Sequence, residues 1–134
     1  MVIMPQKKIL VIDDEVIWHR LLEKLLCPLG YLVYAAASCA DGIRLAGEVH
    51  PDCIVLDFHL QDGDAVSVCT AIRGNRAIGR TPILIFSSDL AAEIEAYSSC
   101  RANGFLHKGA GVMAGVCVAI KDILASTVSE PRES

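Results

Sequence analysis

The sequence predicts an α/β protein with a parallel five-stranded sheet that is covered by helices on both faces. Three observations lead to this prediction. Short apolar runs alternate with segments of helical periodicity, the runs are apolar almost without interruption, and turn residues separate the two kinds of segment. Continuous apolar strands are typical of parallel sheets buried on both faces. A chain of 134 residues is long enough for one such domain and short for two.

Turn and capping residues divide the chain into five strand–helix units. Ser38 and Asp64 occupy the positions of N-caps for the second and third helices. Pro28 and Gly30 end the first helix, and Asn103 begins the turn into the last strand. The expected strands are residues 9–12, 31–36, 53–56, 83–86 and 105–107.

Helical periodicity follows each expected strand, although its strength varies. The fourth helix, from about residue 90 to 101, has the weakest pattern. We expect the folded domain to span residues 7–125, with flexible termini at 1–6 and 126–134. The strongest apolar stripe belongs to the first helix and is formed by Trp18, Leu21, Leu22, Leu25, Leu26 and Leu29.

Composition argues against several classes of protein. The formal net charge is −4 and no run of Lys or Arg stands out, so nucleic-acid binding by this chain is not expected. No apolar run has the length of a membrane span, and the first eight residues do not resemble a secretory signal. The six cysteines form no C-x-x-C pair, which indicates reduced, buried or half-buried thiols rather than a zinc site. We therefore expect a soluble cytoplasmic protein.

Charged or hydroxyl side chains follow four of the five expected strands. Asp13 and Asp14 follow the first strand, Asp57 the third, Ser87 the fourth and Lys108 the fifth. Ligands of open parallel sheets bind outside the carboxyl ends of the strands, and these side chains converge there if the second strand lies at the edge of the sheet. Three clustered carboxylates repel one another unless a cation is present, and Mg²⁺ prefers such oxygen ligands. One carboxylate is then available as a nucleophile, while the ammonium and hydroxyl groups suit phosphoryl oxygens.

Four segments carry a resemblance to a known family. They are ILVIDDE at residues 9–15, PDCIVLD at 51–57, TPILIFS at 81–87 and GFLHK at 104–108. Over about residues 7–125 the sequence resembles the receiver domains of two-component response regulators, in particular the single-domain regulators of chemotaxis. The resemblance implies a doubly wound sheet in the flavodoxin-like order 2-1-3-4-5.

The resemblance also implies roles for the acidic residues. Asp57 would be the phosphoacceptor. Asp14 and Asp57 would bind Mg²⁺ directly, together with the main-chain carbonyl of His59, and Asp13 would act mainly through a metal-bound water. A histidine kinase or a phosphotransfer protein would be the phosphoryl donor. The domain would be regulatory rather than an enzyme with turnover, because transfer and hydrolysis occur on its own aspartate.

The remaining implied roles concern the response to phosphorylation. Lys108 would pair with the acyl phosphate, and Ser87 would bind a phosphoryl oxygen and move toward it. Phe105 would be the switch aromatic that turns inward on activation, and it lacks the hydroxyl of a tyrosine. The readout surface would be the fourth helix, the fifth strand and the fifth helix. The output partner is unknown, and a phosphorylation-dependent homodimer is one option.

The sequence departs from the family pattern at some loop positions. Gly109 stands where the family usually has proline, so we expect no cis peptide bond there. Gln61 replaces a common proline and Ala65 a common glycine. His59 and Asp89 occupy the positions that tune loss of the phosphoryl group in the family. Ligation of a transition metal by His59 is a rival interpretation, which the other histidines do not support.

Other functions remain as alternatives. The chain could be the receiver half of a helix-turn-helix transcription regulator, whose DNA contacts would lie outside it. It could also be a phosphorylation-independent pseudo-receiver, although none of the expected acidic, hydroxyl or lysine positions is lost. A dehalogenase-type phosphatase is disfavoured because the two acids after the first strand are adjacent, and a flavodoxin because that loop is acidic rather than rich in Ser, Thr and Gly.

Overall fold

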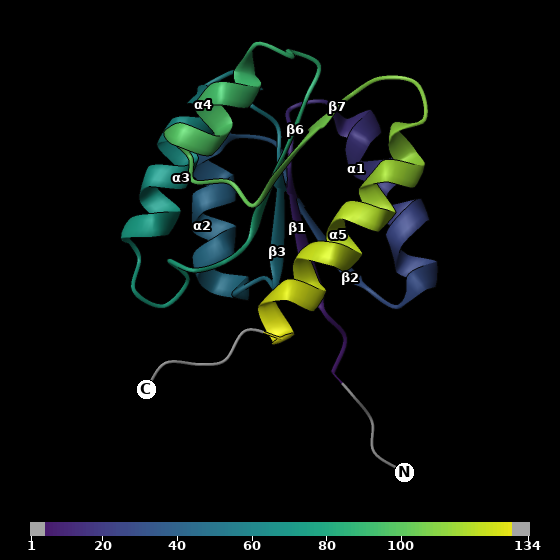
Figure 1. The fold of residues 1–134 in the computed structure, drawn as a ribbon. Helices are drawn as coiled ribbons and strands as arrows, with labels where there is room; N and C mark the ends of the chain where they lie inside the picture. Colours follow the sequence, from purple (N-terminus) through teal and green to yellow (C-terminus); the bar gives the residue numbers. More distant parts are fainter. Residues whose placement is uncertain (1–4, 130–134) are drawn as a thin grey trace.

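The protein contains a five-stranded parallel sheet in the order β2-β1-β3-β6-β7 (Figure 1). The computed structural model describes residues 5–129, so the predictions for residues 1–4 and 130–134 lie outside the described residues. The order confirms the predicted topology, with the second strand at one edge. The strands are β1 (Lys8–Ile12), β2 (Leu32–Ala36), β3 (Cys53–Leu56), β6 (Ile83–Ser87) and β7 (Gly104–His107).

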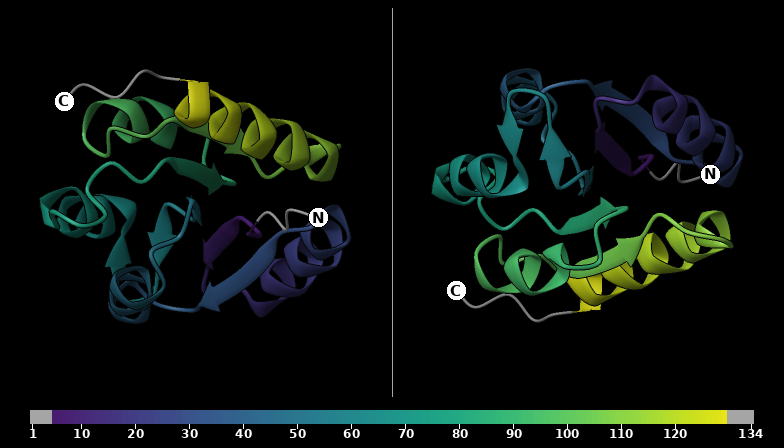
Figure 2. Two further views of the ribbon diagram at one scale, coloured as in Figure 1. Left: turned by 90° about the horizontal axis from the view of Figure 1, so that it is seen from below. Right: turned by 90° about the horizontal axis from the view of Figure 1, so that it is seen from above.

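Helices cover both faces of the sheet, as the apolar strands predicted. One face carries α1 (Val16–Leu26), the short 3₁₀ helix η1 (Cys27–Leu29) and α5 (Val112–Ser129), and the other carries the remaining three helices (Figures 1 and 2). These are α2 (Cys39–Val49), α3 (Ala65–Gly74) and α4 (Ala92–Ser98). Within the described residues, no helix combines the length and apolarity that crossing a membrane requires.

Alternate residues of each central strand enter two separate cores. Ile12 and Leu56 pack into the core beneath α2, α3 and α4. Val11 and Val55 point to the opposite face and join the core beneath α1 and α5. All four side chains are buried, which explains why these strands read as continuous apolar runs. The sheet is thus held from both sides, and the loops at its carboxyl edge are anchored to a rigid base.

Side-chain caps start α2 and α3 at the predicted residues. The Asp41 N–H donates to the Ser38 hydroxyl over 3.1 Å, and the Asp64 carboxylate accepts the N–H groups of Val66 and Ser67. The fourth helix is shorter than expected because it buries only the small side chains Ala92 and Ala96. Its N-cap, Ala91, provides no side-chain hydrogen bond, which matches the weak pattern in the sequence.

Three features were not predicted. A small antiparallel hairpin of β4 (His59–Leu60) and β5 (Gly63–Asp64) precedes α3, and Gly63 has a φ of +155° in it. The last helix continues through Ser129, beyond the expected end near Ser126. All six cysteines are free, and Cys27 is exposed rather than buried or half-buried. The described peptide bonds are all trans, including the one before Gly109.

Candidate functional site

Three carboxylates meet at the carboxyl edge of the sheet, which faces the viewer in the right panel of Figure 2. Asp13 and Asp14 follow β1, and Asp57 follows β3. These two strands are neighbours in register, with Ile12 opposite Leu56, so the next residue of each strand reaches the same point. One oxygen from each of the three carboxylates lies within 4.8 Å of the others. Asp13 and Asp57 are 1% and 8% exposed, so most of this negative charge is removed from water.

Lys108 reaches this carboxylate cluster from β7, the edge strand opposite β2. It follows β7, and its own N–H donates to the main-chain carbonyl of Ser87 over 2.9 Å. Its Nζ lies 2.7 Å from Asp13 Oδ2, 3.6 Å from Asp57 Oδ1 and 3.8 Å from Glu15 Oε1. Only 4% of the lysine side chain is exposed. The ammonium is therefore a buried counter-charge for the cluster.

The electrostatics of the cluster favour a bound cation. Burial, and then the charge of Asp13, raise the pKa of Asp57 from 3.8 to about 6. Asp14 acts in the same direction, while Lys108 and the N–H of Phe58 lower the pKa of Asp57. Lys108 alone thus leaves the negative charge incompletely balanced. Closely spaced carboxylate oxygens with a residual negative charge are a donor set that fits Mg²⁺.

Ser87 lies beside the cluster at the end of β6, which pairs with β3 through Leu56 and Ile85. It is 1% exposed, and its hydroxyl oxygen accepts the N–H of Asp89 over 3.1 Å. Because the hydroxyl accepts in this bond, its own proton can be directed to another oxygen. Sequence reasoning placed Ser87 correctly at this edge of the sheet.

His59 and Asp89 link the two loops on the open side of the cluster. The His59 Nε2 and Asp89 Oδ2 atoms are 2.9 Å apart, and both side chains are largely exposed. The hydrogen bond from His59 lowers the pKa of Asp89. The imidazole of His59 therefore has an aspartate partner outside the carboxylate cluster. Among the described residues, the cluster of three aspartates is the only group of three or more His, Cys, Asp and Glu side chains close enough to share an ion, and His59 is not a member of it.

Phe105 lies on β7, three residues before Lys108. It is half-buried and packs against the core beneath α2, α3 and α4. Its side chain is neither fully enclosed nor fully exposed, and its role as a switch aromatic stays a prediction. The structure brings the acidic, lysine and hydroxyl residues of the site together. Phe105 lies apart from them, on the strand that leads to Lys108.

Three residues of α1 and the loop before it belong to the site although the sequence analysis did not select them. The Trp18 ring contacts the Lys108 ammonium, the Glu15 carboxylate lies near it, and His19 Nε2 lies 2.5 Å from the Asp13 carbonyl oxygen. The sequence pattern assigns Trp18 only to an apolar helix stripe. The available signal was position alone, because these residues lie within about one turn of the acidic pair.

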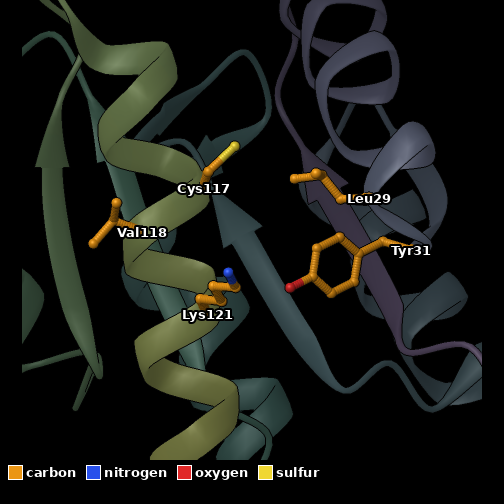
Figure 3. A pocket seen from close by; sticks show the side chains of 5 residues that line it. All are labelled: Leu29, Tyr31, Cys117, Val118 and Lys121. Carbon is orange, nitrogen blue, oxygen red and sulfur yellow. The ribbon is translucent and has the colours of Figure 1, made fainter.

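A separate groove lies between α5 and the segment joining η1 to β2 (Figure 3). It has a volume of about 390 Å³ and is lined by Leu29, Tyr31, Cys117, Val118 and Lys121. Its walls are mainly apolar, and none of the predicted site residues contributes to it. The predicted site residues thus lie at the sheet edge, away from this groove.

Comparison with known proteins identifies the class of domain that this fold and site define. A family model for the response regulator receiver domain matches residues 9–114, which is more than half of the chain. The chain belongs to the response regulator receiver domain family. This finding confirms the resemblance carried by the four sequence segments.

Individual relatives agree with the family assignment. The chain is 32% identical over 129 residues to the acid tolerance regulatory protein ActR of Rhizobium meliloti, covering 96% of this chain and 62% of that protein. It thus spans less than two thirds of this relative. A putative response regulator from Chloroflexus aurantiacus is 27% identical with a TM-score of 0.83, covering 90% of this chain and 99% of that one. The fold is also shared by the receiver domain of the sensor histidine kinase PA1611 from Pseudomonas aeruginosa, with a TM-score of 0.78 and 23% identity. The match covers 90% of this chain and 99% of that one, and the PA1611 domain was solved with magnesium in its active-site cleft.

Proposed function

We propose that this protein is a phosphoacceptor of a two-component phosphorelay, in which Asp57 receives a phosphoryl group from a histidine kinase or a phosphotransfer protein. One observation carries the proposal: the adjacent pair Asp13 and Asp14, Asp57 and Lys108 come from three segments far apart in sequence and converge on one site. A cluster of acids with a single buried lysine is costly in a stable fold unless it serves a charged ligand. A phosphoryl group and a divalent cation together supply such a ligand.

The residues around Asp57 have distinct tasks in the proposed reaction. An Asp57 carboxylate oxygen attacks phosphorus, the new O–P bond forms, and the N–P bond to the donor histidine breaks. Lys108 balances negative charge on the phosphoryl oxygens, and the Ser87 hydroxyl donates a hydrogen bond to one of them. Asp14, Asp57 and the His59 main-chain carbonyl would hold Mg²⁺, with Asp13 acting through water. The ion would supply positive charge to the phosphoryl oxygens during transfer.

The proposed response begins when the phosphoryl group draws the Ser87 hydroxyl toward itself. Ser87 then gives up the hydrogen bond from the Asp89 N–H, and the loop before α4 moves with it. Phe105 fills the space inward from β7. The surface that reports this change is formed by α4, β7 and α5, since α4 and α5 both pack against β7.

The direct test is transfer from a small phosphodonor. Incubation with acetyl phosphate and Mg²⁺, followed by intact mass spectrometry, should add one phosphate to the native chain and none to Asp57→Asn. The control is Asp122→Asn, which removes an exposed carboxylate on α5 and should leave the phosphate increment intact. A full increment on Asp57→Asn would remove Asp57 from the acceptor role, and chelation of Mg²⁺ should suppress transfer to the native chain.

The domain could also act as the receiver part of a longer regulator. The observation that favours this candidate is that the chain covers only 62% of the regulatory protein ActR. In that case the surface of α4, β7 and α5 would contact an attached output domain rather than a separate protein. The reading frame that encodes the chain tests the idea, because a continuation into a helix-turn-helix segment would establish an output domain and a stop codon would exclude it.

A further inference from the structure

We infer that Trp18 is a positioning residue for Lys108, because its indole ring holds the ammonium at the carboxylate cluster through a cation–π contact. The second half of this inference, that the contact speeds phosphoryl transfer, rests on the proposed function. The first half does not, because the placement of Lys108 is measurable without any phosphodonor. Trp18 would act through Lys108 and would not itself touch the reacting atoms.

Two aromatic rings form one wall of the lysine site. Lys108 Nζ lies 5.1 Å from the centroid of the Trp18 ring and 5.2 Å from that of Phe86. The two rings contact each other edge to face, with centroids 5.0 Å apart and an interplanar angle of 87°. Both distances fall within the range of about 6 Å in which a ring attracts a cation, and the attraction is stronger when the ammonium is removed from water.

Lys108 needs a neutral support because its other partners are anions. Asp13 holds the ammonium at 2.7 Å, and the carboxylates of Asp57 and Glu15 lie at 3.6 and 3.8 Å. Each of these carboxylates competes with an incoming phosphoryl group for the same positive charge. A ring does not have to be displaced, so its contact can persist while the ammonium exchanges Asp13 for a phosphoryl oxygen. The four-carbon lysine stem has many rotamers, and a lasting contact limits them.

The two rings differ in their suitability for this role and for its test. Phe86 is a fully buried residue of β6, so its removal would leave a cavity in the core. Trp18 is half-buried on α1 and packs at the margin of the core beneath α1 and α5. Trp18 can therefore be substituted while the sheet remains intact. Its contact with Lys108 links α1, the helix after the acidic pair, to the residue that follows β7.

The test compares Trp18→Leu, which keeps apolar bulk without a ring, with Trp18→Phe, which keeps a ring. Competitive acetylation followed by peptide mass spectrometry measures the accessibility of Lys108 relative to Lys8, whose Nζ donates to the Val49 carbonyl. Leu25→Ala is the matched control, because it removes half-buried packing from the same helix away from Lys108. Initial rates of phosphorylation by acetyl phosphate and urea unfolding are measured for the same proteins.

We expect Trp18→Leu to raise the acetylation of Lys108 several-fold relative to that of Lys8. It should also slow phosphorylation roughly tenfold, because a catalytic group that is moved out of position loses much of its effect on the rate. Trp18→Phe should restore most of both properties, and Leu25→Ala should resemble the native chain. Equal behaviour of Trp18→Leu and the native protein would overturn the inference, as would equal defects in Trp18→Leu and Trp18→Phe, since packing volume would then be the cause. If the native chain takes up no phosphate, the proposed function fails, while the order of acetylation still decides the placement of Lys108.

Discussion

An inner side-chain pair that includes a member of the carboxylate cluster and an outer pair beside the cluster have almost the same separation of nitrogen and oxygen. Lys108 and Asp13 are 2.7 Å apart, and His59 and Asp89 are 2.9 Å apart. The side chains of the first pair are 4% and 1% exposed, whereas those of the second are 62% and 42% exposed. Water screens the outer pair and hardly reaches the inner one. Distance alone therefore says little about what each pair contributes.

The inner pair is built into the sheet, and the outer pair joins two loops. Asp13 and Lys108 extend from the ends of β1 and β7, and their positions follow from strand register and main-chain hydrogen bonds. His59 lies in the β4 hairpin and Asp89 in the turn before α4. We conclude that the inner pair sets the charge balance of the site, while the outer pair can open without disturbing the fold.

The largest effect should come from removing the inner cation. Lys108→Met leaves three carboxylates without their buried counter-charge, so we expect the free energy of unfolding at pH 7 without divalent cations to fall by about 3–5 kcal/mol. Urea unfolding measures this loss. Mg²⁺ should restore part of it, because the ion replaces the missing positive charge.

Lys121→Met is the control for this substitution. Lys121 is exposed on α5, and its loss should change the free energy of unfolding by less than about 0.5 kcal/mol. If Lys108→Met proved as harmless as Lys121→Met, the contrast between buried and exposed charges at this site would be wrong.

The next effect has the opposite sign and depends on pH. The pKa of Asp57 is raised from 3.8 to about 6, so the folded protein binds a proton that the unfolded chain does not bind between these values. The contribution of Asp57 to stability should therefore rise as pH falls from 7 toward 4, and the ionised carboxylate costs the fold about 2–3 kcal/mol above pH 6. Asp57→Asn removes this cost. It should be more stable than the native protein at pH 7, and the difference should vanish below about pH 4.

Urea unfolding of the native and Asp57→Asn proteins across this pH range, with a chelator present, checks the prediction. The comparison of the two proteins cancels titrations elsewhere in the chain. A difference that stays constant from pH 7 to pH 4 would show that Asp57 titrates normally.

A double variant tests whether Asp57 and Lys108 act on each other. When Lys108→Met is combined with Asp57→Asn, the loss in the free energy of unfolding caused by the lysine substitution should shrink, because one of the repelling charges is gone.

The smallest effect on stability should come from the outer pair. His59→Ala removes the hydrogen bond to Asp89, and we expect no change in unfolding beyond experimental scatter because both side chains are exposed. The pKa of Asp89 should nevertheless rise, since the bond from His59 is the main cause of its lowering. Titration of the Asp89 carboxyl by NMR measures this shift. A clear loss of stability in His59→Ala would mean that the two loops depend on each other.

The sequence predicted the sheet well because its signals are local. Apolar runs, Ser38 and Asp64 each act within a few residues, and the structure confirms the strands and both caps. The hairpin of β4 and β5 was missed because two-residue strands leave no periodic pattern. The limits of α4 were uncertain for a related reason, since its buried face consists only of Ala92 and Ala96.

The site was predictable as far as strand ends determine it. Ser87 is the last residue of its strand, and Asp13, Asp57 and Lys108 each directly follow a strand, so parallel register brings them together. Trp18 could not be assigned in this way, because a helix stripe does not reveal which of its members reaches a ligand. That information depends on how α1 packs on the sheet, which is a tertiary property.

Trp18 is the only tryptophan in the chain, and it contacts the lysine that balances the site. Its fluorescence therefore reports on a single location, without a label and without competing emitters of the same kind. Any event that moves the Lys108 ammonium changes the electric field at the indole. A shift in emission on addition of Mg²⁺ or a phosphodonor would give the rate and the affinity of each event in a cuvette, from the unmodified protein.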